Sequence, residues 1–152
     1  LAAMKEFAFM KALYQNDFSV PTPVDQNRHC VVMQLCEGYP LYQIKTMENA
    51  QVVYKRMMDT IIRLAQYGLI HCDFNEFNLM INNEGEITVI DFPQMVSTEH
   101  ENAKYYFDRD VECVRKFFGK ILRADVSEYP RWGKFGPRLR SLPRLQGGIN
   151  HE

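Results

Sequence analysis

The stretch that decides the fold is His-Cys-Asp-Phe-Asn-Glu-Phe-Asn at residues 71–78, which Asp-Phe-Pro follows at residues 91–93. Between them, two short apolar runs flank the turn-forming sequence Asn-Asn-Glu-Gly, a pattern that predicts a β-hairpin. A hairpin returns the chain to the side from which it started. We therefore expect the side chains of Asp73, Asn78 and Asp91 to converge at one end of it.

These three side chains indicate a metal-assisted chemistry. Two carboxylates and a carboxamide supply the oxygen ligands that Mg²⁺ prefers, and they suit phosphoryl transfer, in which a protein mainly positions groups and neutralises charge. The spacing H-x-D-x-x-x-x-N before a strand-ending D-F is the catalytic-loop and metal-loop pattern of protein kinases. In that pattern His71 supports the loop. Ordinary turn and capping residues are the plainer alternative, which the order of both halves around a predicted hairpin disfavours.

The sequence on either side of this stretch predicts a mixture of helices and strands. Apolar residues at helical spacing predict a helix at residues 1–15 and a longer one at 48–67 that Gly68 ends. Residues 17–23 read as a loop, and the β-branched run at residues 30–35 predicts a buried strand. A last helix is expected at residues 108–123, with an apolar stripe of Val111, Val114, Phe118 and Ile121.

The composition is that of an ordinary folded domain. The chain has 152 residues, with 18 Lys and Arg against 19 Asp and Glu, and 46% of its residues are apolar. These values exclude a disordered tail, a fibre and a strongly basic nucleic-acid module as descriptions of the whole chain. No run approaches the roughly 20 apolar residues that span a bilayer, so no membrane partner is expected. The four cysteines show no CxxC spacing, which predicts neither a zinc site nor a disulfide framework.

The last part of the chain has a different composition. Residues 127–152 hold four of the eight Gly, three of the seven Pro and five Lys or Arg residues, and they show no helical or strand period. This composition predicts a basic, flexible tail after a domain that ends near residue 126. A solvated tail is the favoured interpretation over a nucleic-acid patch.

At this point a resemblance becomes specific. Residues 71–81 and 90–97 are similar to the RIO family of atypical serine/threonine protein kinases, and most of all to its RIO kinase 2 subfamily. The same resemblance is supported by residues 4–13, 27–29, 38–41 and 106–111. It covers about residues 1–126 and implies a protein-kinase-like α+β fold, represented by helix C, the hinge and a mainly helical C-lobe.

The resemblance also implies an ATP site. Glu6 would be the helix-C glutamate that pairs with a strand lysine, although a solvated charge is the plainer alternative for it. Met33 would lie beside the adenine, where core packing is the plainer alternative. The hinge backbone at Gln34 and Cys36 would hydrogen-bond the adenine.

For the reacting groups, the resemblance implies Asp73 as the catalytic aspartate and Asn78 with Asp91 as the Mg²⁺ ligands. Asp91 would also accept phosphate transiently. Asp110 would brace the catalytic loop from below, with Asp108 as a close competitor. Cys72 occupies a position where the family commonly carries Gly.

The family implies an ATP- and Mg²⁺-dependent kinase or ATPase that acts in maturation of the small ribosomal subunit. Its partners would be ATP and the pre-40S particle, through ribosomal RNA and protein contacts, in the cytoplasm with the nucleus as a second location. The chain begins at Leu1 within a predicted helix and contains no G-x-G-x-x-G, and Lys5 cannot be the strand lysine because it neighbours Glu6. We therefore expect most of the N-lobe sheet to be missing and this chain alone to be a poor enzyme.

Two other functions remain open from the sequence. One is a non-catalytic module that binds pre-ribosomal particles through the C-lobe and the basic tail. The other is a small-molecule phosphotransferase of the aminoglycoside or choline kinase type, which shares H-x-D-x-x-x-x-N. Residues 75–77 and 92–94 argue against the second.

Overall fold

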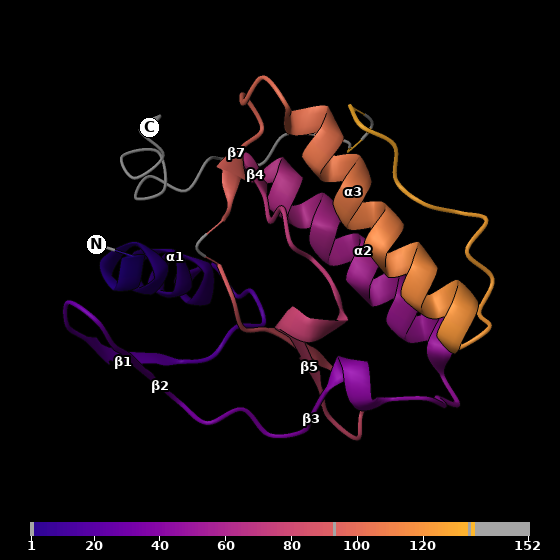
Figure 1. Cartoon of the computed structure of the whole chain (residues 1–152), viewed down its shortest axis with the longest axis horizontal. Helices are drawn as coiled ribbons and strands as arrows, with labels where there is room; N and C mark the ends of the chain where they lie inside the picture. Colours follow the sequence, from indigo (N-terminus) through magenta and orange to yellow (C-terminus); the bar gives the residue numbers. More distant parts are fainter. Residues whose placement is uncertain (1, 93, 134, 136–152) are drawn as a thin grey trace.

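The computed structural model describes residues 2–92, 94–133 and 135. Two long helices, α2 (Ala50–Gln66) and α3 (Ala103–Lys116), lie alongside each other and form one side of the molecule (Figure 1). The helix α1 (Ala2–Gln15) lies on the other side, where it packs on the hairpin of β1 (Pro23–Gln26) and β2 (Val31–Met33). No helix in these described ranges is long and apolar enough to cross a membrane.

Short antiparallel strands lie between the two sides. The strand β3 (Tyr39–Pro40) pairs with β5 (Leu79–Ile81), which pairs in turn with β6 (Ile87–Val89). A second ladder joins β4 (Leu69–Ile70) to β7 (Val96–Ser97). The predicted hairpin is confirmed, because β5 and β6 are its two strands. Two short 3₁₀ turns, η1 (Leu41–Gln43) and η2 (Glu76–Asn78), follow β3 and precede β5.

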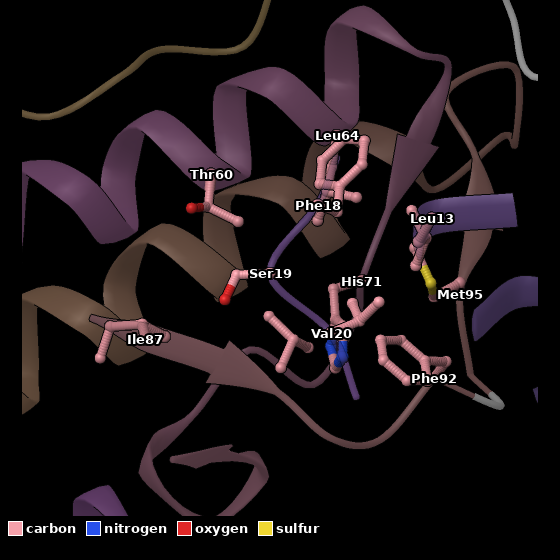
Figure 2. A pocket seen from close by; sticks show the side chains of 11 residues that line it. Leu13, Phe18, Ser19, Val20, Thr60, Leu64, His71, Ile87, Phe92 and Met95 are labelled. Atoms are coloured by element: carbon pink, nitrogen blue, oxygen red, sulfur yellow. The ribbon is translucent and has the colours of Figure 1, made fainter. Parts of the chain in front are cut away.

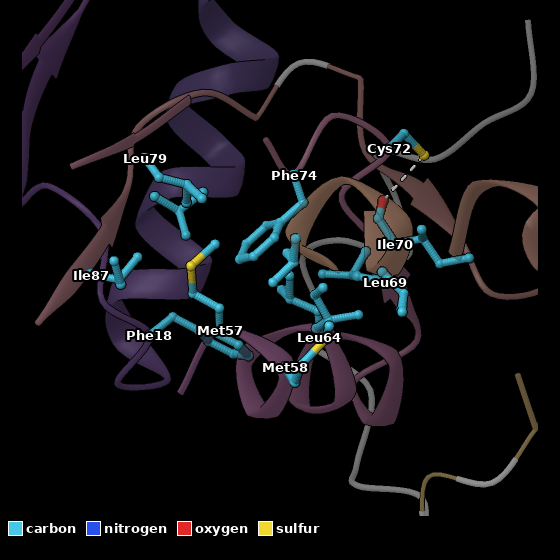
Figure 3. Close-up of a cluster of buried hydrophobic side chains, with 14 of the residues drawn as sticks. Phe18, Met57, Met58, Leu64, Leu69, Ile70, Cys72, Phe74, Leu79 and Ile87 are labelled. Atoms are coloured by element: carbon cyan, nitrogen blue, oxygen red, sulfur yellow. Dashed lines mark hydrogen bonds between the residues drawn. The ribbon is translucent and has the colours of Figure 1, made fainter. Parts of the chain in front are cut away.

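The helix α2 supplies much of the core. The apolar residues that recur along it, Val53, Met57, Ile61 and Leu64, are buried. Tyr67 and a left-handed Gly68 (φ 87°) follow its last turn, as the sequence indicates. Side chains of α2 meet those of β4, the loop after it and β5 in one cluster (Figure 3), which includes Met57, Leu64, Leu69, Phe74 and Leu79. Burial of these large side chains fixes the start of the 71–78 loop on the helical side.

The last helix differs from the prediction at both ends. It begins at Ala103, five residues earlier than expected, because Ala103 and Phe107 extend the buried stripe of Val111 and Val114. After Lys116 the chain forms a π turn, η3 (Phe117–Ile121). The wider turn changes the phase of the helix, so Ile121 is 42% exposed and the prediction that it belongs to the stripe is wrong.

The strand predicted at residues 30–35 is shorter and less buried than expected. It is limited to β2, where Val32 is 52% exposed, and Leu35 beyond its end is 91% exposed. The segment that precedes it, expected as a loop up to Pro23, continues into β1. The cause is that β1 and β2 form a two-stranded sheet with α1 against it, so the outward residues of β2 face solvent.

The first residues of the predicted tail are packed. Tyr129, Trp132 and Phe135 lie against the core, and the Tyr54 hydroxyl donates a 2.6 Å hydrogen bond to the Glu128 carbonyl. The Arg115 guanidinium lies 3.9 Å from the centre of the Tyr129 ring. The structure therefore differs from a flexible tail at these residues. Residues 134 and 136–152 lie outside the described part.

One arginine ties α1 to α2. The guanidinium of Arg63 donates hydrogen bonds to the carbonyls of Asn16 (2.6 Å) and Asp17 (3.1 Å), just past the carboxyl end of α1. The same group lies 4.1 Å from the centre of the Phe18 ring. A cation at this end also interacts favourably with the helix dipole. The carboxyl end of α1 is thus fixed to the helical side of the molecule.

Candidate active site

The loop of residues 71–78, called the catalytic loop from here on, brings Asp73 and Asn78 together as the sequence predicts. The Asn78 side-chain amide donates to Asp73 Oδ2 (2.8 Å) and to the Asp73 carbonyl (2.9 Å). The Asn75 amide donates to Asp73 Oδ1 (2.7 Å), and the Asn75 oxygen in turn accepts from the Phe77 amide and starts η2. Because the Asn78 nitrogen is used in this way, its Oδ1 is the atom that remains to bind a ligand.

Asp91 lies close to the same loop. The Ile90 amide donates to the Asn78 carbonyl (3.1 Å), which fixes the end of β6 against the end of the loop. Partial burial raises the pKa of Asp91, and the Asp73 carboxylate raises it further. The two carboxylates therefore repel each other, and a cation between them would relieve the repulsion.

This donor set fits Mg²⁺. It includes an asparagine, because among the described residues no group of three or more His, Cys, Asp or Glu side chains could hold a metal ion. Two carboxylates and one carboxamide match the habit of Mg²⁺, which is bound through one or two carboxylates and completes its shell with water and substrate phosphates.

His71 links the two loops from inside the molecule. It is buried, its Nδ1 accepts from the Asp73 amide (3.1 Å), and its Nε2 donates to the Asp91 carbonyl. Burial lowers the pKa of His71 to about 4, so the ring is neutral at physiological pH. The supporting role that the sequence assigns to His71 agrees with these bonds.

Asp110 braces the catalytic loop, and Asp108 does not. The buried Asp110 carboxylate accepts from the amides of Cys72 (2.9 Å) and Phe74 (3.2 Å), whereas Asp108 is exposed and pairs with Lys104 (2.7 Å). Burial raises the pKa of Asp110 to about 6, against the lowering effect of the two amides. The sequence therefore identified the correct candidate.

Arg109 makes a further bond from α3 to the loop, which the sequence did not predict. Its guanidinium donates to the carbonyl of Cys72, the residue whose amide donates to Asp110. The only sequence signal was its place beside Asp110 in the 106–111 stretch.

Cys72 has an unusual backbone. Its φ is 74°, in the left-handed region that favours glycine, and its thiol donates to the Ile70 carbonyl at 3.5 Å (Figure 3). Burial raises the pKa of the thiol to about 12, so it stays protonated and a catalytic thiolate is excluded.

The residues predicted for ATP binding lie in two places. Glu6 on α1 is half-buried, and burial raises its pKa, which the negative charge of Asp91 raises further. The three ion pairs within the described ranges all lie on α2 and α3, and none involves Glu6.

The hinge residues lie further along the chain, on and after β2. Met33 is half-buried against the core, and the Gln34 amide donates to the Thr22 carbonyl (2.9 Å), so that amide is not available to an adenine. Cys36 is half-buried. In the described part of the chain, no hydrogen bond joins these three residues to the catalytic loop.

A small cavity is lined on one side by His71, Phe92 and Met95 (Figure 2). Its volume is about 20 Å³, which is room for about one water molecule. Its lining is mostly apolar and includes Leu13, Phe18, Leu64, His71, Phe92 and Met95. It is too small for a nucleotide.

Comparison with known proteins shows the family of the chain. The family model described as the RIO domain matches residues 1–130. The chain belongs to the RIO family. It is 61% identical over 135 residues to the serine/threonine-protein kinase rio2 of Dictyostelium discoideum, a match that covers 89% of this chain and 25% of that protein. It is 50% identical over 131 residues to the RIO2 protein of Saccharomyces cerevisiae, covering 82% and 31%.

A solved RIO structure has the same fold. The Rio2 kinase–ADP/Mg²⁺–phosphoaspartate complex from Chaetomium thermophilum matches with a TM-score of 0.85 and 40% identity, over 97% of this chain and 48% of that one. The resemblance to RIO kinase 2 and the kinase-like α+β fold are thus confirmed. The chain spans about a quarter to a third of the length of these curated relatives and about half of the solved chain.

Proposed function

We propose that this chain carries the catalytic and metal loops of an ATP- and Mg²⁺-dependent serine/threonine kinase or ATPase. The observation that carries the proposal is the meeting of Asp73, Asn78 and Asp91 at one end of the hairpin, held from inside by His71 and Asp110. The names of the relatives, which are serine/threonine-protein kinases, support it.

Each predicted residue has a role in this proposal. Asn78 and Asp91 hold Mg²⁺, which when bound neutralises charge on the phosphates of ATP. Met33 packs beside the adenine, and the Gln34 carbonyl with the Cys36 amide meets its edge. Glu6, whose pKa the Asp91 charge raises, would pair with a basic group.

The reaction begins at Asp91. A carboxylate oxygen of Asp91 forms a bond to the γ-phosphorus of ATP, the bond from that phosphorus to the bridging oxygen breaks, and ADP leaves with the electron pair. A water molecule or a protein hydroxyl then attacks the acyl phosphate, and the exposed Asp73 carboxylate accepts its proton. The Chaetomium thermophilum structure, which holds ADP, Mg²⁺ and a phosphoaspartate, supports this order of events.

Nucleotide binding tests the proposal. We expect a fluorescent ATP analogue to bind with Mg²⁺ and to bind about tenfold more weakly in EDTA, when Asp91→Asn removes the negative charge of one metal ligand, or when Asn78→Ala removes the other ligand. The control is Asp108→Asn, an exposed aspartate of α3. Binding that is indifferent to Mg²⁺ and to both variants would contradict the proposal.

The same proposal includes a role in maturation of the small ribosomal subunit, in the cytoplasm with the nucleus as a second location. Its support is family membership alone. The test is sedimentation of the tagged chain with pre-40S particles from cell extract. If Asp73→Ala and Asp91→Ala leave co-sedimentation unchanged and deletion of residues 136–152, which spares the packed residues before them, abolishes it, the non-catalytic binding module is favoured. The RIO matches give no support to a small-molecule phosphotransferase.

A further inference from the structure

An exposed pair of aromatic rings lies beside the catalytic loop. The rings of Tyr42 and Phe77 stack with their centres 5.4 Å apart and their planes at 28°. Phe77 is 63% exposed and immediately precedes Asn78 on η2, whereas Tyr42 is 41% exposed on η1. The two turns contact each other where β3 and β5 pair (Figure 1).

Packing does not require these rings to face solvent. The same loop carries Phe74, which is fully buried, so one phenylalanine of the loop anchors it and the other points outward. Aromatic side chains that stay largely exposed next to a site commonly bind a partner, since they offer a large rigid contact area at a low cost in conformational entropy.

The charges around the pair select the kind of partner. Asp73 is exposed, Glu76 is the neighbour of Phe77, and Asp91 lies within electrostatic reach of Asp73. A basic group also lies at the pair, since the Lys45 amine donates to the Tyr42 carbonyl. An RNA strand would bring phosphates towards these carboxylates, whereas a polypeptide can present an apolar side chain with basic neighbours.

We propose that Tyr42 and Phe77 position a polypeptide substrate by stacking on one of its aromatic or aliphatic side chains, close in sequence to the hydroxyl that accepts phosphate. The inference rests on the proposed kinase function and assigns two residues that position its polypeptide substrate. Both are positioning residues, since neither touches the reacting atoms.

The experiment measures peptide binding by fluorescence anisotropy. The probes are a short labelled serine peptide with arginine and phenylalanine residues, the same peptide with alanine for phenylalanine, and labelled oligouridine. We expect the phenylalanine peptide to bind about tenfold more tightly than the alanine peptide. That preference should disappear in Phe77→Ala and in Tyr42→Ala, and stay in the control Tyr14→Ala, a similarly exposed tyrosine on α1.

Binding of the ATP analogue to the same variants separates this inference from the proposed function. We expect Mg²⁺-dependent ATP binding to be unchanged in Tyr42→Ala, which also shows that this variant is folded. Intact ATP binding with no preference for the phenylalanine peptide overturns the inference alone. A preference that persists in both alanine variants, or oligouridine binding that both variants abolish, overturns it too. A preference that follows the two rings while ATP binding fails shows that the rings bind the peptide, but it contradicts the proposed function and with it the substrate role.

Discussion

The catalytic loop and the β1–β2 hairpin are both short, partly apolar segments, yet they are held in opposite ways. The amides of Cys72 and Phe74 bond to a buried carboxylate of α3, and the loop closes over the buried His71. The hairpin is held by its own ladder and by α1, and Val32 and Leu35 remain exposed. A backbone held by a few buried side chains depends on those residues, whereas a ladder depends on none in particular.

The largest expected effect that sharpens this contrast is Asp110→Ala. The variant leaves two buried amides without acceptors, so we expect a loss of about 3 kcal/mol in the free energy of unfolding. Urea denaturation followed by circular dichroism measures it. The matched control is Asp108→Ala, which removes an exposed i,i+4 ion pair and should cost less than about 0.5 kcal/mol. Equal losses in the two variants would contradict the contrast.

The next effect concerns the pH dependence of His71. Its pKa of about 4 lies below its ordinary value of 6.5. Its contribution to the free energy of unfolding is therefore full above pH 6.5 and is lost as the pH falls towards 4. At pH 5 the contribution of His71 to the free energy of unfolding is about 2 kcal/mol lower than at pH 8.

Asp110 acts in the opposite direction. Its pKa of about 6 lies above its ordinary value of 3.8, so its contribution is full below pH 3.8 and is lost as the pH rises through 6. In the wild type these two contributions therefore largely offset each other. His71→Phe removes one side of this balance and should become more stable, by about 1 kcal/mol, as the pH falls from 8 to 5. Parallel pH profiles for the two proteins would refute the assignment.

A third effect comes from the left-handed backbone at Cys72. A β-branched residue is strained there, so Cys72→Val should unfold at a free energy about 2 kcal/mol lower than Cys72→Gly. Both variants lose the thiol, which makes each the control for the other. Thermal unfolding gives the difference, and equal stabilities would show that this φ is not enforced.

The smallest effect is expected in the hairpin. Leu35→Ser and Val32→Thr replace exposed side chains and should change the free energy of unfolding by less than about 0.5 kcal/mol. The same denaturation curves measure them. A loss comparable to that of Asp110→Ala would mean that the hairpin is held as specifically as the loop, and the contrast would fail.

The sequence predicted best what depends on local pattern. The β5–β6 hairpin follows from two apolar runs around Asn-Asn-Glu-Gly, and the buried face of α2 follows from its period. The convergence of Asp73 and Asn78 follows from their sharing one loop. These features need no knowledge of distant parts of the chain.

What the sequence could not predict depends on distant partners. The burial of residues 30–35 depends on what covers β2, and the π turn after Lys116 leaves no periodic signal. The packing of Tyr129 depends on Arg115 in another element. The bond from Arg109 to the Cys72 carbonyl joins residues 37 apart, and only the folded chain shows it.

Arg63 holds the carboxyl end of α1, so a tilt of the helix would mainly move its amino-terminal end. Glu6 lies ten residues from Asn16, or about 15 Å along a helix that rises about 1.5 Å per residue. With the carboxyl end fixed, a tilt of about 10° would move Glu6 by roughly 2.6 Å, a large step on the scale of an ion pair. A tilt of α1 about the Arg63 contacts would therefore change the separation between Glu6 and Asp91.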